Sequence, residues 1–152
     1  MNEPIDARRE SWIRGGEACG DVVSLQPHLN PFITHLKGQA SALSPGRTAE
    51  LISTRIAQLL DVPSGETSLG EAVRNWYSSG ELTAAEKVVL DIAEQFVVDV
   101  HGVTDESFAR LREHYGTPDI LAMLFQMALC DGFTKFNKVA FAGHGKETTN
   151  VK

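Results

Sequence analysis

Capping signals and apolar faces at helical spacing alternate with turns along the second half of the chain. The box Thr83-Ala84-Ala85-Glu86 places a threonine three residues before a glutamate, so that each side chain can bond the other residue's backbone N–H at a helix start. The apolar side chains after this box cover more than one narrow stripe, through Val88, Val89, Ile92, Ala93, Phe96, Val97 and Val100. We therefore expect a helix over about 83–100 whose apolar arc is wide enough to touch two partners.

The same signals predict helices along most of the chain. We expect them over 6–14, from Pro27 or Pro31 to about Leu43, from Ser44-Pro45 to Leu60, from the box at 68–71 to Tyr77, from Thr104 or Asp105 to Gly116, and from Thr117-Pro118 to Phe133. No long segment alternates apolar and polar residues as a strand does. The pattern predicts a compact all-α bundle of about six or seven helices. Residues 1–142 would form one domain, including an N-terminal extension over 1–26 with a glycine-rich loop, and 143–152 a flexible tail.

The last expected helix is apolar almost all round from Ile120 to Phe133. A domain of this size seldom encloses such a helix completely, so part of its face is expected in a subunit interface. We therefore expect a homo-oligomer (a dimer, trimer or hexamer) assembled through the 83–100 and 120–133 helices.

The composition of the chain limits the kinds of partner that we expect it to bind. The chain has 152 residues, of which 42% are hydrophobic and 22% charged, as in a soluble globular protein. Its net charge of −6 argues against nucleic acid or an anionic membrane as the partner. The longest uncharged apolar run, 120–130, is shorter than the roughly 20 residues that span a bilayer. With no signal-peptide pattern at residues 1–10 and two isolated cysteines, Cys19 and Cys130, we expect a cytoplasmic protein with free thiols.

From Pro27 to Val139, and most strongly from Leu82 onward, the order of caps, apolar faces and breaks resembles the alkyl hydroperoxidase D-like / carboxymuconolactone decarboxylase-like family. The resemblance implies that family's all-α fold and a pocket. Its redox members share a motif that begins with a glutamate. Eleven residues separate this glutamate from a Cys-x-x-Cys pair, and three residues separate the pair from a histidine. The segment 47–61 is similar to the helix that leads into this motif, with Glu50 at the glutamate position.

The thiols of that motif are missing here. Val62 and Gly65 stand at the two cysteine positions, and Leu69 stands at the histidine position. Peroxide reduction by a dithiol needs a thiolate with a resolving thiol beside it, so we expect no such activity. Cys130 is expected to be a packed core thiol, and Cys19 has no cation near it in the sequence.

The family also contains lactone decarboxylases without redox cysteines, so the resemblance still implies catalysis. We expect a cofactor-independent acid–base enzyme (a decarboxylase, lyase, isomerase or cyclase) acting on a small carbonyl- or carboxylate-bearing compound. The alternative is a non-catalytic oligomeric binding or assembly protein that kept the fold, and a peroxidase is a remote third. No histidine follows a glutamate by three residues, so no metal site is expected.

The first site candidates lie around the expected helix 45–60. Glu50 is the expected acid or base, although a helical wheel places it opposite the apolar Ile52 and Ile56, where a solvated residue would lie. Arg55, at the edge of the apolar face, would either orient a substrate carboxylate or enolate or pair with a carboxylate of the protein. The expected apolar lining comprises Val62, Trp76, Tyr77 and Phe96, and it would raise the pKa of Glu50.

Two further acid–base candidates lie later in the chain. His101 precedes a helix cap, where packing of the turn competes with a catalytic role. Asp131 interrupts an apolar run, so it would either pair with Lys135 at i, i+4 or act as a pocket acid.

Overall fold

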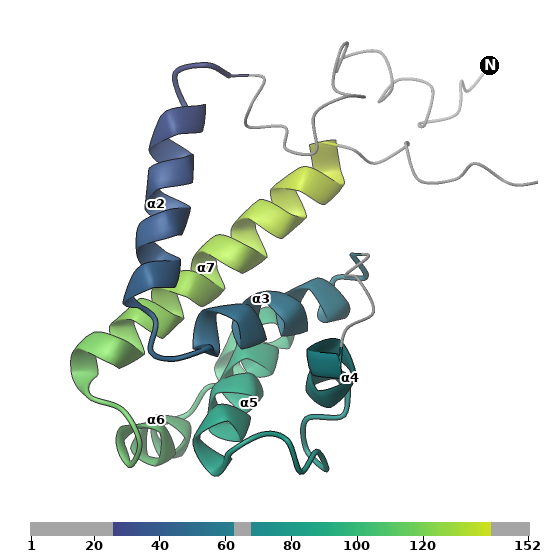
Figure 1. Ribbon diagram of the computed structural model, residues 1–152, viewed down its shortest axis with the longest axis vertical. Helices are drawn as coiled ribbons and strands as arrows, with labels where there is room; N and C mark the ends of the chain where they lie inside the picture. The colour runs from purple at the N-terminus through teal and green to yellow at the C-terminus, as the bar shows by residue number, and fades with distance from the viewer. Residues whose placement is uncertain (1–25, 63–67, 141–152) are drawn as a thin grey trace, which may run out of the picture. The chain divides into compact units, whose positions relative to one another are not determined.

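A computed structural model describes residues 26–62 and 68–140 (Figure 1). Within these ranges there are six α-helices, a short 3-10 helix and no strand, which confirms the all-α expectation. The helices are α2 (Asn30–Leu43), α3 (Thr48–Leu59), α4 (Ser68–Arg74), α5 (Ala84–Val98), η3 (Val100–Gly102), α6 (Asp105–Arg112) and α7 (Thr117–Ala140). The expected helix over 6–14, the glycine-rich loop and the tail lie outside the described residues.

Residues 35–134 form one compact unit, and the described residues on either side of them, 26–34 and 135–140, belong to another. The larger unit holds two clusters of buried apolar side chains. The first cluster joins α3, α5, α6 and α7 and contains Ile52, Ile56, Val89, Ile92, Ala93, Leu111, Ile120, Met123 and Met127. The second joins α3, α4 and α5 and contains Leu51, Ala72, Val73, Leu82 and Leu90.

Most of the apolar arc of α5 is covered inside this unit, but Val98 at its end is 67% exposed, and Val100, which was expected on the arc, lies in η3 and is 59% exposed. Val89 and Ile92 face the first cluster and Leu90 faces the second, and all three side chains are almost completely buried. Figure 1 shows α5 passing behind α3, with α4 beside the C-terminal end of α3. Other helices of the same chain therefore cover most of this arc.

The threonine caps are confirmed, but the expected serine cap is not. Thr83 and Glu86 form the capping box of α5, and Thr104 caps α6 through a reciprocal contact with Ser107. Ser44, in contrast, does not open a helix. Its Oγ donates to the Ala40 carbonyl at 2.9 Å and so closes α2.

A tight turn delays the start of the next helix. Gly46 has φ +55°, a conformation that favours glycine, and α3 begins only at Thr48. The Thr48 hydroxyl donates to the Pro45 carbonyl at 2.6 Å. Other boundaries also differ: Thr117 is the first residue of α7 rather than its cap, α6 ends at Arg112, and α7 continues past Phe133. The residue before Ser68 lies outside the described residues.

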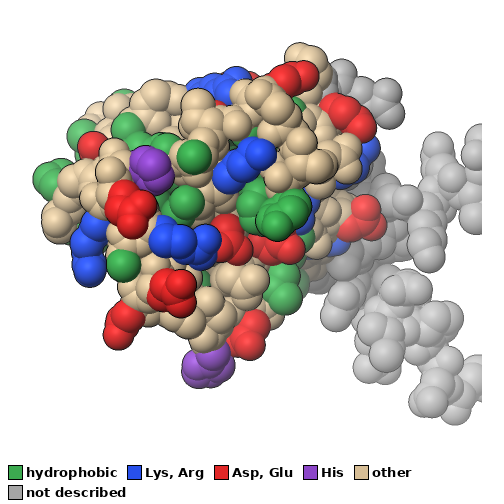
Figure 2. Space-filling model, turned by 90° about the horizontal axis from the view of Figure 1, so that it is seen from below, with side chains coloured by type: hydrophobic (Ala, Val, Ile, Leu, Met, Phe, Trp, Pro, Cys, Tyr) green, Lys and Arg blue, Asp and Glu red, His purple; other side chains and the backbone are tan. Residues whose placement is uncertain are grey.

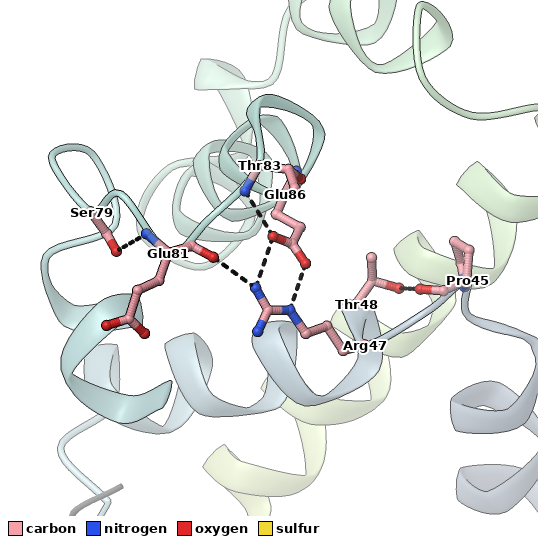
Figure 3. A network of polar contacts seen from close by, with 7 residues as sticks. All are labelled: Pro45, Arg47, Thr48, Ser79, Glu81, Thr83 and Glu86. Carbon is pink, nitrogen blue, oxygen red and sulfur yellow. Dashed lines mark hydrogen bonds and ion pairs between the residues drawn. The ribbon is translucent and has the colours of Figure 1, made fainter. Parts of the chain in front are cut away.

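An ion pair connects the start of α3 with the start of α5 (Figure 3). Arg47 donates from Nε and Nη2 to the two carboxylate oxygens of Glu86, at 2.6 and 3.1 Å, and from Nη2 to the Glu81 carbonyl at 3.0 Å. The backbone N–H of Thr83 donates to the same carboxylate at 2.9 Å. The capping box of α5 therefore also holds α3. The hydrogen bond from Arg47 is the main cause of a lowered pKa for Glu86, and it outweighs the opposing effect of burial.

This arrangement predicts a pH-dependent contribution to stability. Because the pKa of Glu86 is lower in the folded chain, its contribution is complete above the unfolded-state pKa of about 4.3 and is lost as pH falls through the folded value. We expect Glu86→Gln to lower the free energy of unfolding by about 1–2 kcal/mol at pH 7. The difference from the unsubstituted protein should shrink below about pH 4, as measured by urea unfolding at pH 7 and pH 3. Glu81→Gln is the matched control, because Arg47 bonds only the backbone of Glu81. A difference for Glu86→Gln that stays constant over this pH range would contradict the role of its carboxylate.

The surface carries mixed charges. Figure 2 shows acidic and basic side chains interspersed over one face of the molecule, with apolar side chains in small groups between them. Among the described helices, none combines the length and the apolar character needed to cross a membrane.

Candidate functional site

Helices α3 and α5 and the turn after α4 bring Arg55, Trp76 and Glu94 together around one carboxylate oxygen. Arg55, on α3, donates from Nη2 to Glu94 Oε2 on α5 at 2.6 Å. Trp76, in the turn after α4, donates from its indole Nε1 to the same oxygen at 3.0 Å. The side chain of Arg55 is 13% exposed and that of Glu94 is 31% exposed. Two of the predicted site residues therefore meet at a third that we did not predict.

This Arg55–Glu94–Trp76 cluster keeps unused hydrogen-bonding capacity. Arg55 Nε is buried, and no acceptor from the described residues reaches it. Its Nη1 has only a long 3.5 Å contact with Gln58 Oε1, because the Gln58 amide is directed to the Gly70 carbonyl at 2.7 Å. In the described ranges, no hydrogen bond ends on Glu94 Oε1. Buried donors without acceptors are rare in native proteins, so this N–H is an unusual feature of the cluster.

Opposing effects set the protonation of Glu94. Burial is the strongest of them and raises the pKa of this carboxyl, but the hydrogen bonds from Arg55 and Trp76 and the charge of Arg55 together bring the pKa below its ordinary value. The group is therefore an anion at neutral pH. An anion with one oxygen held by two donors and the other oxygen open can accept a proton or a hydrogen bond from a ligand.

Glu50 is placed differently from the expected pocket base. It is exposed in the first turn of α3, where its charge contributes to raising the pKa of Arg47. Within the described residues, no hydrogen bond or ion pair connects it with the Arg55–Glu94–Trp76 cluster. The helical wheel had indicated this exposed position.

Only some of the residues expected to line the site lie at the Arg55–Glu94–Trp76 cluster. Trp76 belongs to the cluster, and the Tyr77 ring stacks edge-on against it at 5.8 Å, but Tyr77 is 83% exposed and lies at the surface. Phe96 is half-buried and packs against the first apolar cluster. Val62 is half-buried, and its backbone N–H donates to the Ala57 carbonyl at the end of α3.

The two later acid–base candidates lie elsewhere. His101 is exposed in η3, and its backbone N–H donates to the Asp99 side chain at 3.0 Å, a contact typical of a turn. Asp131 is half-buried on α7. No hydrogen bond or ion pair in the described ranges brings either residue to Glu94.

Cys130 is a partly buried thiol packed against the first apolar cluster. Its Sγ lies 3.3 Å from both Ser53 Oγ and Gln126 Nε2. Burial raises the pKa of the thiol, which outweighs these hydrogen bonds, so Cys130 is a weak nucleophile at neutral pH. Cys19 lies outside the described residues. The part of the chain that the structure describes contains no group of three His, Cys, Asp or Glu residues arranged to hold a metal ion.

Glu94 is the site residue that sequence reasoning missed. One signal was available, because an arginine at the edge of an apolar face needs a carboxylate partner from another helix, and pairing with a carboxylate was one of the two readings given for Arg55. The partner lies 39 residues away, and the sequence offers no way to choose it among the acidic residues of 83–100.

Comparison with protein-family models, curated proteins and solved structures finds no match to this chain. The resemblance described above therefore stays a prediction that rests on the residues quoted for it.

Proposed function

We propose that this chain is a cofactor-independent acid–base enzyme that acts on a small carbonyl- or carboxylate-bearing compound, with Glu94 as its base. One observation supports the proposal above the others. A carboxylate that is ionised at neutral pH, and whose Oε1 receives no hydrogen bond from the described residues, lies beside a buried guanidinium N–H that has no acceptor among them. Such a pair offers a proton acceptor and an oxyanion donor within one cluster.

The proposed chemistry uses each member of the cluster once. Arg55 binds an oxygen of the compound, either a carboxylate oxygen or the carbonyl oxygen that becomes an enolate. Glu94 Oε1 takes the proton from the carbon next to that carbonyl, and the C–H electron pair forms the enolate double bond. Trp76 holds Glu94 Oε2 and so directs the other oxygen. Lyases, isomerases and cyclases can use this C–H step, whereas a decarboxylase forms the enolate from the C–C bond that breaks as CO2 leaves and then protonates it. None of these chemistries requires the missing thiol pair.

Glu94 replaces Glu50 in this proposal for a physical reason. A general base must lie within reach of its substrate together with a group that stabilises the developing charge. Glu94 has Arg55 at 2.6 Å, whereas Glu50 is exposed and has no such bond in the described ranges.

The non-catalytic alternative is favoured by the same ion pair. The 2.6 Å contact neutralises Arg55 and Glu94 mutually, and it also connects α3 with α5. In this alternative the cluster serves only to hold helices together, as expected for a binding or assembly protein. Measurements of ligand binding and of proton exchange distinguish the acid–base enzyme from the non-catalytic binding or assembly protein.

Proton exchange tests the proposal without a known substrate. In D2O at pH 7, we expect the protein to accelerate the loss of the proton NMR signals next to the ketone of pyruvate or 2-oxobutyrate. Glu94→Gln keeps the shape of the side chain and removes its basicity, so the catalysed rate should fall by about 10²-fold or more. Glu50→Gln is the matched control and should leave the rate unchanged. Thermal unfolding by circular dichroism establishes that each variant is folded. A folded Glu94→Gln protein with full exchange activity would refute Glu94 as the base, and no acceleration by the unsubstituted protein would favour the non-catalytic alternative.

A further inference from the structure

Gln58 connects the Arg55–Glu94–Trp76 cluster with α4. It follows Arg55 by three residues, so both side chains leave the same face of α3. Its amide donates from Nε2 to the carbonyl of Gly70, in the first turn of α4, at 2.7 Å, and its Oε1 lies 3.5 Å from Arg55 Nη1. One half-buried side chain therefore contacts both the guanidinium of the cluster and the helix that precedes Trp76.

The place of α4 on α3 depends on contacts with the rest of the chain. This helix has only seven residues, and a helix of that length is not stable by itself. Ala72 and Val73 are buried in the second apolar cluster, but apolar contacts are non-directional and define a position less sharply than a hydrogen bond does. The bond from Gln58 to the Gly70 carbonyl is directional, so it holds the first turn of α4 at one place on α3.

The indole bond to Glu94 is sensitive to that place. Trp76 Nε1 lies 3.0 Å from Glu94 Oε2, and a shift of about 1 Å would lengthen the contact beyond hydrogen-bonding range. Only Asn75 separates Trp76 from the end of α4 at Arg74, so a movement of the helix carries the indole with it. We propose that Gln58 is a positioning residue of the cluster, which holds the first turn of α4 and thereby keeps the Trp76 indole on Glu94.

The chemistry of the Gln58 side chain agrees with this role. An amide has a donor at one end and an acceptor at the other, and Gln58 directs its donor to a carbonyl and its acceptor to a cation. Methionine has a similar length and lacks both groups. Glutamate keeps the shape but loses the donor, and its charge would compete with Glu94 for Arg55. Gln58→Met and Gln58→Glu therefore remove the bond to α4 in two different ways.

The indole N–H of Trp76 reports its own contact with Glu94. In a Trp12→Phe background Trp76 is the remaining tryptophan of the chain, so a ¹⁵N-labelled sample gives a single indole signal. We expect Gln58→Met to shift this signal. The exchange of the indole N–H with water should become about threefold to tenfold faster, because its bond to Glu94 opens more often.

Gln126→Met is the matched control. The Gln126 amide donates to Ser53 on α3 and to Cys130 on α7, both at 3.3 Å, so this substitution also removes a contact between α3 and another helix. It should lower the free energy of unfolding and leave the exchange of the Trp76 indole unchanged. Equal changes of indole exchange in the two variants would show that Gln58 contributes to stability alone and would overturn the proposal.

Gln58→Glu adds a measurement that a loss of packing would not move. Burial raises the pKa of Glu94, whereas the hydrogen bonds from Arg55 and Trp76 and the charge of Arg55 lower it. Loss of the indole bond and competition for Arg55 both act to raise the pKa of Glu94. The pH titration of the indole signal should therefore move to higher pH in Gln58→Met, and further in Gln58→Glu. A titration that stays in place in both folded variants would contradict the positioning role.

The catalytic consequence of this role rests on the proposed function. If Glu94 is the base, Gln58→Met should slow the exchange of pyruvate protons by about tenfold, because the base remains but is less well directed. If the indole responds as expected in a protein that exchanges no pyruvate protons, the positioning role is supported and the proposed base is refuted. Full exchange activity and an unmoved indole signal in folded Gln58→Met would support the base and overturn the role of Gln58.

Discussion

Replacing Arg55 by methionine is expected to lower the free energy of unfolding by about 2–3 kcal/mol. The substitution keeps much of the apolar length of the side chain but removes the cation that holds Glu94 Oε2 at 2.6 Å. Glu94 then remains partly buried as a carboxylate with only the Trp76 indole as donor. The cost lies below that of breaking a fully buried ion pair because Glu94 is 31% exposed and water can reach it.

A double-mutant cycle isolates the pair itself. We expect Arg55→Met and Glu94→Gln together to cost less than the sum of the two single changes, because the double variant leaves no unpaired charge. The ion pair between Arg110 and Asp91, at 2.8 Å on α6 and α5, is the matched control, since its side chains are 47% and 29% exposed. Arg110→Met should cost about 0–1 kcal/mol. Equal losses at Arg55 and Arg110 in urea unfolding would show that the Arg55 pair is no more than a surface contact.

Truncation of α3 in the core should have the largest effect on stability. Ile56 is completely buried in the first apolar cluster, where it meets side chains from α5, α6 and α7. We expect Ile56→Ala to cost about 3–5 kcal/mol, the sum of lost apolar burial and of the cavity that remains. Leu59 is only half-buried on the same helix, so Leu59→Ala should cost roughly half as much.

The comparison of these two variants by urea unfolding also tests which face of α3 is inside. On a helical wheel, Ile52, Ile56, Leu59 and Leu60 share one apolar face. The structure buries the first two and adds Leu51, which faces the second cluster, while Leu59 and Leu60 are half-buried. Similar costs for Ile56→Ala and Leu59→Ala would contradict the packing described here.

The sequence predicted the fold well where the signals are local. The capping box at Thr83 depends on residues three positions apart and forms as expected, and Thr104, one of the two caps expected for the next helix, caps α6. Ser44-Pro45 failed because Gly46 inserts a turn with positive φ, so that the serine bonds backward to α2 instead of opening α3. A glycine directly after a Ser-Pro start signal was the available warning.

The candidate site was less predictable because it depends on contacts between distant segments. Arg55 and Trp76 were singled out from their places on helix faces, and the fold brings both to Glu94. Glu94 itself gave no separate signal, since its role follows from the packing of α3 against α5. Glu50 was chosen by its position in a family motif, and position in a motif does not by itself place a side chain in a cavity.

Direct observation of ligand binding at Trp76 tests the central proposal most closely. The chain has two tryptophans, Trp12 and Trp76, so Trp12→Phe leaves one indole N–H signal in a ¹⁵N-labelled protein. Because that N–H donates to Glu94 Oε2 at 3.0 Å, a compound that binds Arg55 and Glu94 must change its environment. Titration with pyruvate or 2-oxobutyrate is predicted to shift the signal saturably, and Glu94→Gln in the same background should abolish or strongly weaken the shift. An indole signal that does not move with either compound, in a folded protein, would contradict a carbonyl- or carboxylate-binding site at this cluster.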